Sequence, residues 1–210
     1  MPLGDEALLV RFADNLDEEA NRRAISFARL LEDNPVPGMI EIVPNLVSVL
    51  VRYTPANIRY HRLAGEIRLR LGQLGEHPPA SGESWTLEAE LDGPDLDDVA
   101  TSLNLSRDGF IKAHNQTELR VLAVGFAPGF LYCGMHPENL IVPRRKTVRP
   151  KVPRGTILFA AGQTAITATS VPTGWHVIGH TDFINFDPQA EPPVRIRAGD
   201  RIGFSVAPAQ

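Results

Sequence analysis

The sequence of 210 residues has a single cysteine, Cys133, and lacks any apolar run of the roughly 18 residues needed to span a membrane. One cysteine cannot form a disulfide bond within the chain, and the lack of a Cys-x-x-Cys pair excludes a cysteine-based structural zinc site. Asp5 and Glu6 stand where a signal peptide would carry positive charge. We therefore expect a protein of the reducing cytoplasm.

Positive charge is also scarce, because 21 Lys and Arg face 25 Asp and Glu and give a net charge of -4. Nucleic-acid binding normally needs a basic surface, so we expect no nucleic-acid partner. The sequence lacks the Gly-x-x-x-x-Gly-Lys-Ser/Thr phosphate loop, the Gly-x-Gly-x-x-Gly dinucleotide motif and the Gly-x-Ser-x-Gly nucleophile elbow. If ATP or an acyl nucleophile takes part, another chain or an unfamiliar site would supply it.

The first part of the sequence predicts an α+β domain, because helical and strand periodicities alternate there. The predicted order β-α-β-β-α suits a ferredoxin-like arrangement with two helices on one face of an antiparallel sheet. Residues 85–91 are a candidate fourth strand. The predicted elements are a strand at 7–12, a helix from Asp17 to about Asn34, a hairpin of strands at 39–43 and 46–53, and an amphipathic helix at 58–74.

Residues 75–82 are polar and rich in turn formers, which is typical of a linker. We place the domain boundary there, with an N-terminal domain at 1–82 and a second domain at 83–210.

The second domain is predicted to be mainly β. Two short helices are expected first, at 95–103 and 106–115, with Ser106 as the N-cap of the second. Short apolar runs between Gly and Pro turns then predict a barrel or sandwich. The predicted strands are 119–124, 157–160, 165–169, 176–178, 183–186 and 202–206.

Residues 125–181 combine turn-forming Gly and Pro with aromatic and polar side chains. An apolar wall with a few directional polar groups is typical of a ligand pocket, so we interpret this segment as the candidate site. The alternative is a loop-rich β domain whose turns happen to use these residues.

Six cations lie within eleven residues, from Arg144 to Arg154, and the prolines among them forbid a helix. The planar guanidinium groups of Arg144 and Arg149 suit two-point binding of a carboxylate or phosphate. For any one of these cations, an exposed loop position is the alternative.

The six histidines form no strong metal motif, and we expect no metal site. His176 and His180 with Asp182 come nearest to one, but no third ligand has a defined spacing. His114, at the end of a predicted helix, is placed to reach a cleft. Cys133 would serve as a nucleophile only with a base to lower its pKa, and a buried small hydrophobic residue is the alternative.

Several motifs together resemble the B subunit of bacterial 5-oxoprolinase, a family whose members are also called allophanate hydrolase subunit 1 and Kip-type sporulation-kinase inhibitors. The resemblance spans nearly the whole chain. The motifs are Gly4–Val10, Glu41–Pro44, Gly93–Leu96, Gly125–Tyr132, Pro143–Arg144, Arg149–Pro150, Val152–Gly155, Ala161–Thr164 and Gly174–Trp175.

The resemblance implies a small α/β domain followed by a cyclophilin-like β-barrel, as in the carboxyltransferase region of urea carboxylase. It also implies a substrate cleft shared with a larger homologous subunit, while a third subunit completes the ATP-dependent opening of 5-oxoproline to glutamate. The chain is then a hydrolase subunit that is inactive alone. No cofactor is expected on this chain by itself, and ATP is used by the complex.

On this resemblance, Arg144 and Arg149 would hold the carboxylate of a cyclic or urea-derived amide, and Gln163 would bind its carbonyl. His180 stands where an Arg is common in the family, which removes a permanent cation and leaves a related carboxylate or amide open as the ligand. No catalytic base is assigned. The implied substrate-binding residues are Phe130, Tyr132, Arg144, Arg149, Gln163, Thr164 and Trp175, with His114 and His180 as further candidates.

Three other functions stay open. The barrel groove would suit the helical dimerisation stem of a histidine kinase, because apolar grooves accept amphipathic helices. Prolyl isomerisation is suggested only by the barrel type, and fold is a poor guide to activity. Hydrolysis of allophanate would need an activated serine or an equivalent group, and the sequence shows no such motif.

Overall fold

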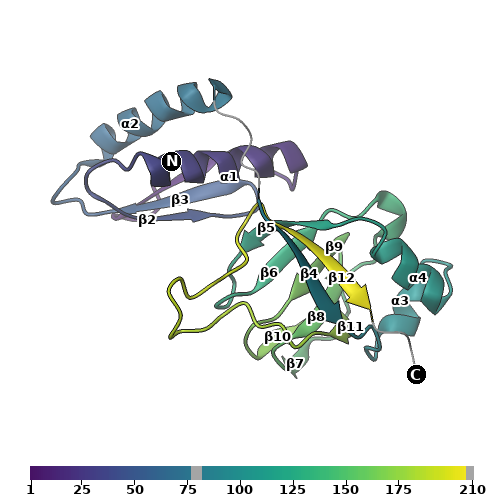
Figure 1. The fold of residues 1–210 in the computed structure, drawn as a ribbon. Coiled ribbons are helices and arrows are strands. Elements are labelled where there is room, and N and C mark those ends of the chain that lie inside the picture. The colour runs from purple at the N-terminus through teal and green to yellow at the C-terminus, as the bar shows by residue number, and fades with distance from the viewer. Residues whose placement is uncertain (77–81, 207–210) are drawn as a thin grey trace. The chain divides into compact units, whose positions relative to one another are not determined.

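The computed structural model describes residues 1–76 and 82–206. The chain divides into two compact units, Met1–Ser81 and Gly82–Gln210 (Figure 1). Most of the predicted linker at 75–82 lies outside the described residues.

The first unit has the predicted order of elements. Its strands form an antiparallel sheet in the order β1-β3-β2. The fourth strand expected at 85–91 is wrong for this unit, because that segment pairs in parallel with β12 in the sheet of the second unit. The elements are β1 (Ala7–Arg11), α1 (Glu18–Asp33), β2 (Met39–Pro44), β3 (Ser48–Tyr53), α2 (Tyr60–Gln73) and the 3-10 turn η1 (Leu74–Glu76).

Helix α1 forms where its sequence predicts it. The N–H of Ala20 donates to the carboxylate of Asp17 over 2.7 Å and so caps the first turn. The buried face carries Ala24, Phe27 and Leu31, all less than 2% exposed, which pack with the buried strand residues in one core. This regular spacing of apolar residues fixes the side of the helix that faces the sheet.

The second unit is built on a curved seven-stranded sheet in the order β11-β8-β9-β6-β5-β12-β4, with a separate β10-β7 pair (Figure 1). Helices α3 and α4 lie in the same unit. Its elements are β4 (Ser84–Ala89), α3 (Leu96–Ser102), α4 (Arg107–His114), β5 (Leu119–Val124), β6 (Leu131–Gly134), the 3-10 turn η2 (Glu138–Leu140), β7 (Arg149–Val152), β8 (Thr156–Ala160), β9 (Gln163–Ile166), β10 (Val171–Thr173), β11 (His176–His180) and β12 (Arg201–Val206).

The predicted N-cap at Ser106 is confirmed, since its hydroxyl accepts the N–H of Gly109 over 3.0 Å. The strand predicted at 183–186 is wrong. There the buried amide side chain of Asn185 donates to the carbonyl of Ile196 and accepts the N–H of the same residue, over 3.0 and 2.8 Å. These side-chain bonds replace the backbone ladder that a strand would need.

Across residues 1–76 and 82–206, no helix combines the length and the apolar character that crossing a membrane would require.

We predict that Gly155→Ala destabilises the second unit. Gly155 has φ of +79°, and an added Cβ would lie 2.2 Å from the carbonyl oxygen of Thr181. A left-handed backbone and a steric clash together should lower the free energy of unfolding by about 2 kcal/mol or more. Urea unfolding followed by circular dichroism measures this.

The matched control is Gly65→Ala in α2, where an added Cβ meets nothing within 4 Å. It should leave stability unchanged or raise it by about 1 kcal/mol, because alanine favours helix. Equal unfolding midpoints for Gly155→Ala and the unchanged chain would contradict the prediction.

Candidate functional site

Strand alternation gives the strands β8, β9 and β6 two faces of different chemistry. Successive side chains of a strand point to opposite sides of a sheet. On β9, Gln163 and Ala165 therefore share one face, while Thr164 lies on the other. Tyr132 pairs directly with Ala165 and belongs to the first face. We call this side the aromatic face, and its apolar members include Phe130, Tyr132, Leu158, Ala165 and Trp175.

The rings of the aromatic face form a continuous series of contacts. The ring centroids of Phe130 and Tyr132 lie 4.8 Å apart, and those of Tyr132 and Trp175 lie 6.0 Å apart. The guanidinium carbon of Arg144 lies 5.6 Å from the centre of the Trp175 ring, a cation–π arrangement. Burial raises the pKa of Tyr132, and the charge of Arg144 partly opposes this. Four of the predicted site residues are thus brought together.

Gln163 supplies the aromatic face with an unused hydrogen-bond donor. Only 7% of the residue is exposed, and its Nε2 is buried without a hydrogen-bond partner among the described residues. An unmet buried donor costs about 1–3 kcal/mol, so a ligand oxygen that accepts from it would bind with a corresponding gain. The predicted role of Gln163 as a donor to a carbonyl stays a prediction.

Arg149 has a different partner from the one expected. Its Nη2 lies 2.6 Å from Oδ1 of Asp95, which also accepts from Arg145, while Oδ2 accepts the N–H of Val177 over 2.8 Å. Burial alone would raise the pKa of Asp95, but the Val177 bond and the two arginines outweigh it and hold this pKa below its ordinary value. Arg149 is therefore engaged within the protein, whereas Arg144 stays exposed.

Asp95 was not among the predicted site residues. It immediately precedes α3, and its partners are 50 to 82 positions away in the sequence. The only sequence signal was its place in the motif Gly93–Leu96.

Thr164 and His114 come together on the opposite face of the sheet, with a second histidine. The hydroxyl oxygen of Thr164 lies 2.8 Å from Nε2 of His114 and 2.9 Å from Nε2 of His136. The carbonyl oxygen of the Asn115 side chain can only accept, so Nδ1 of His114 carries the proton. Thr164 then donates to His114 and accepts from His136.

This histidine cluster is closed to solvent. His114 and Thr164 are at most 1% exposed, and His136 is 8% exposed. Burial lowers the pKa of His114 to about 4, and burial together with the nearby His114 lowers that of His136 to about 3. Both rings are neutral at pH 7. Thr164 and His114 are therefore placed apart from the aromatic face.

Cys133 is fully buried, and burial strongly raises the pKa of its thiol. It therefore lacks the thiolate character that a nucleophile requires.

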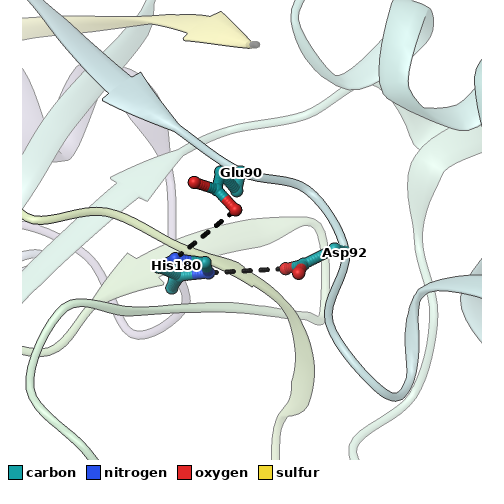
Figure 2. A group of neighbouring side chains, drawn as sticks. All are labelled: Glu90, Asp92 and His180. Atoms are coloured by element: carbon teal, nitrogen blue, oxygen red, sulfur yellow. Dashed lines mark ion pairs between the residues drawn. The ribbon is translucent and has the colours of Figure 1, made fainter. Parts of the chain in front are cut away.

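His180, the last residue of β11, lies between Glu90 and Asp92 on the surface (Figure 2). Its Nε2 is 3.8 Å from Glu90 Oε2, and its Nδ1 is 3.4 Å from Asp92 Oδ1. The three side chains are close enough together to be considered as metal ligands, a grouping that sequence spacing did not predict. The carboxylates approach different nitrogens of one ring, however, which suits an exposed ion-pair cluster better than a single ion.

The described architecture is that of a mixed α/β protein of the carboxyltransferase kind, with a curved sheet that forms half a barrel. It superposes on the urea carboxylase of Kluyveromyces lactis with a TM-score of 0.75, at 14% identity, over 97% of this chain and 21% of that one. Residues 1–196 match the model of the carboxyltransferase domain, subdomain C and D, and the chain belongs to this family.

Two curated relatives both carry the name of the B subunit of 5-oxoprolinase. The protein of Bacillus subtilis is 32% identical over 96% of this chain and 90% of its own length. That of Escherichia coli O157:H7 is 31% identical over 96% and 93%. The crystal structure of TTHA0988 shares 33% identity with a TM-score of 0.83, over 97% of this chain and 40% of that longer one.

We predict that the histidine cluster makes the protein sensitive to acid. Between pH 6.5 and about 4 the unfolded chain binds protons at both histidines and the folded chain does not. Stability should therefore fall as the pH falls through this range, by up to about 1.4 kcal/mol per pH unit for each histidine. Urea unfolding at a series of pH values measures the slope.

The double variant His114→Gln, His136→Gln should show a shallower slope, because glutamine does not titrate. The control His61→Gln removes an exposed histidine of the first unit and should keep the original slope. An unchanged slope in the double variant would disprove the assignment.

We predict that Asp95→Asn lowers the free energy of unfolding by about 3 kcal/mol, since it leaves two arginines without their buried counter-charge. The control Asp98→Asn changes an exposed carboxylate in the first turn of α3, which Asp95 precedes, and should have an effect below about 0.5 kcal/mol. Chemical unfolding compares the two, and equal effects would argue against Asp95 as a structural anchor.

Proposed function

We propose that this chain is a subunit of an ATP-dependent 5-oxoprolinase-type complex and that its aromatic face forms one wall of the substrate cleft. The family and the relatives named as 5-oxoprolinase subunits support the type of complex. The observation that carries the assignment of the face is the buried, unpartnered amide of Gln163 on the same side of the sheet as Tyr132.

The chemistry of 5-oxoproline suits these side chains. The molecule has a cyclic amide and a carboxylate, so it needs a donor for its carbonyl oxygen and a cation for its acid group. Gln163 supplies the donor, and Arg144 supplies an exposed guanidinium beside Trp175. Phe130, Tyr132 and Trp175 would exclude water from the ring and strengthen both interactions.

The role of this chain in the proposal is to bind and orient the amide. Cys133 is buried as a thiol, and the sequence shows no nucleophile elbow. Holding a reactant in the right geometry lowers the barrier without a covalent step on the holding protein. We place Arg149 and Thr164 outside the binding set, because Asp95 and the two histidines already engage them.

The rest of the reaction is assigned to other chains. A larger homologous subunit would form the opposite wall of the cleft, and a third subunit would complete ATP-dependent hydrolysis in the cytoplasm. The aromatic face would then belong to a cyclophilin-like barrel domain at 83–210, which follows an α+β domain at 1–82 in the sequence. The chain alone would be inactive and bind no cofactor.

We predict that Gln163→Ala and Arg144→Ala each lower kcat/KM for 5-oxoproline in the assembled, ATP-supplied complex. Losing one buried or charged hydrogen bond costs about 1–3 kcal/mol, which corresponds to roughly 5- to 150-fold. A coupled assay of glutamate release measures the rate.

The control is Arg154→Ala, an exposed cation of the same basic segment that lines a different cavity, near Phe183 and Arg195. Its rate should match that of the unchanged complex. An active complex that is indifferent to both Gln163→Ala and Arg144→Ala would exclude the aromatic face as the substrate wall.

A further inference from the structure

Two large apolar side chains at the edge of the aromatic face point into solvent. Phe126 is 71% exposed, the highest value for any large apolar side chain among the described residues, and Val148 is 67% exposed. Single exposed apolar residues are ordinary on a protein surface, so their meaning depends on their conformation and on what they adjoin.

The backbone holds Phe126 outward at a cost. Its φ is +72°, a left-handed conformation that is unfavourable for a bulky L-residue. Bonds from Gly125 N–H to the Phe130 carbonyl (3.0 Å) and from Phe130 N–H to the Ala127 carbonyl (3.1 Å) enforce this turn. A glycine at this position would form the same turn without strain. The sequence thus has an exposed phenylalanine at position 126, where backbone strain alone would favour glycine.

Both side chains are continuous with the aromatic face. The Phe126 ring lies 5.4 Å from that of Phe130, edge to face. Val148 Cγ2 lies 3.9 Å from the point that a Cβ on Gly174 would occupy, so it adjoins the residue before Trp175. Phe126 therefore extends the series of ring contacts, and Val148 lies beside the residue before Trp175. We call these two exposed side chains the apolar rim.

The segment of sequence that carries this rim has an excess of positive charge. Residues 125–181 contain six Lys and Arg and a single acidic residue, Glu138. Asp95 compensates Arg145 and Arg149 from outside the segment. Arg144 and Lys146, close to Val148 in sequence, remain exposed. Two copies of this face would bring like charges together, which disfavours self-association, whereas a partner with carboxylates around an apolar patch fits it.

We propose that Phe126 and Val148 anchor the aromatic face to a different subunit of the same complex, whose facing surface is apolar and ringed by carboxylates. This rests on the proposed function, because that function supplies the second wall of the cleft. The strain at Phe126 is then compensated on assembly, when the ring leaves water and fills a pocket of the partner.

The test uses the full chain and the purified larger 5-oxoprolinase subunit of the same organism, immobilised on a biosensor. Phe126→Gly and Val148→Ala should each weaken the equilibrium affinity at least tenfold. Phe126→Gly should also keep or raise the melting temperature, because glycine relieves the positive φ. Raising the salt concentration should weaken the wild-type complex. The matched control Leu69→Ala removes a side chain that is 68% exposed on α2 and should leave the affinity unchanged.

Unchanged affinity in both rim variants, or no binding by the unchanged chain, would overturn the proposal. So would a dimer of this chain, detected by sedimentation, that Phe126→Gly abolishes, since the occupant would then be a second copy. The two proposals fail separately. A complex that assembles normally with Phe126→Gly but loses activity with Gln163→Ala disproves only the rim. A complex that needs Phe126 but ignores Gln163→Ala and Arg144→Ala disproves only the substrate wall.

Discussion

The candidate site depends on the hydrogen bonds and ion pairs of one buried carboxylate, that of Asp95. It binds two arginines of the basic segment and the backbone of β11 at once, so it joins three parts of the second unit that are distant in sequence. The N–H of Arg145 also donates to the carbonyl of Gly174 over 2.7 Å. These bonds hold the basic segment beside Trp175. Arg145 and Arg149 are thereby paired with Asp95, whereas the guanidinium group of Arg144 lies over the Trp175 ring.

The elements that the sequence predicted well are those set by local signals. The apolar spacing of α1 and the cap at Ser106 depend only on residues within one or two helical turns. The errors arose where contacts with residues distant in the sequence determine the structure. The strand expected at 85–91 forms at 84–89, but its pairing with β12 assigns it to the sheet of the second unit. At 183–186 the apolar residues are only partly buried and form no strand, because the buried residue is Asn185, whose side chain bonds to the backbone of Ile196.

The candidate site shows the same division. The motifs identified a cluster of aromatic and polar residues, and the structure brings Phe130, Tyr132, Arg144 and Trp175 into contact. Composition could not tell which arginine has an internal counter-ion, since Asp95 lies far away in the sequence. Gln163 and Thr164 are adjacent in one motif, yet strand alternation sends them to opposite faces of the sheet. A single motif thus combines a residue suited to a ligand with one that serves the interior.

The shared hydroxyl of Thr164 also limits how this protein can diverge. One oxygen serves two imidazoles, as donor to His114 and acceptor from His136. Valine at this position would match the shape of threonine but would leave both buried imidazole rings without a hydrogen bond to residue 164. A change at either histidine would likewise remove one hydrogen-bond partner of the hydroxyl. Serine is the one simple replacement that preserves both bonds. The residues at positions 114, 136 and 164 should consequently be retained or substituted together among related proteins.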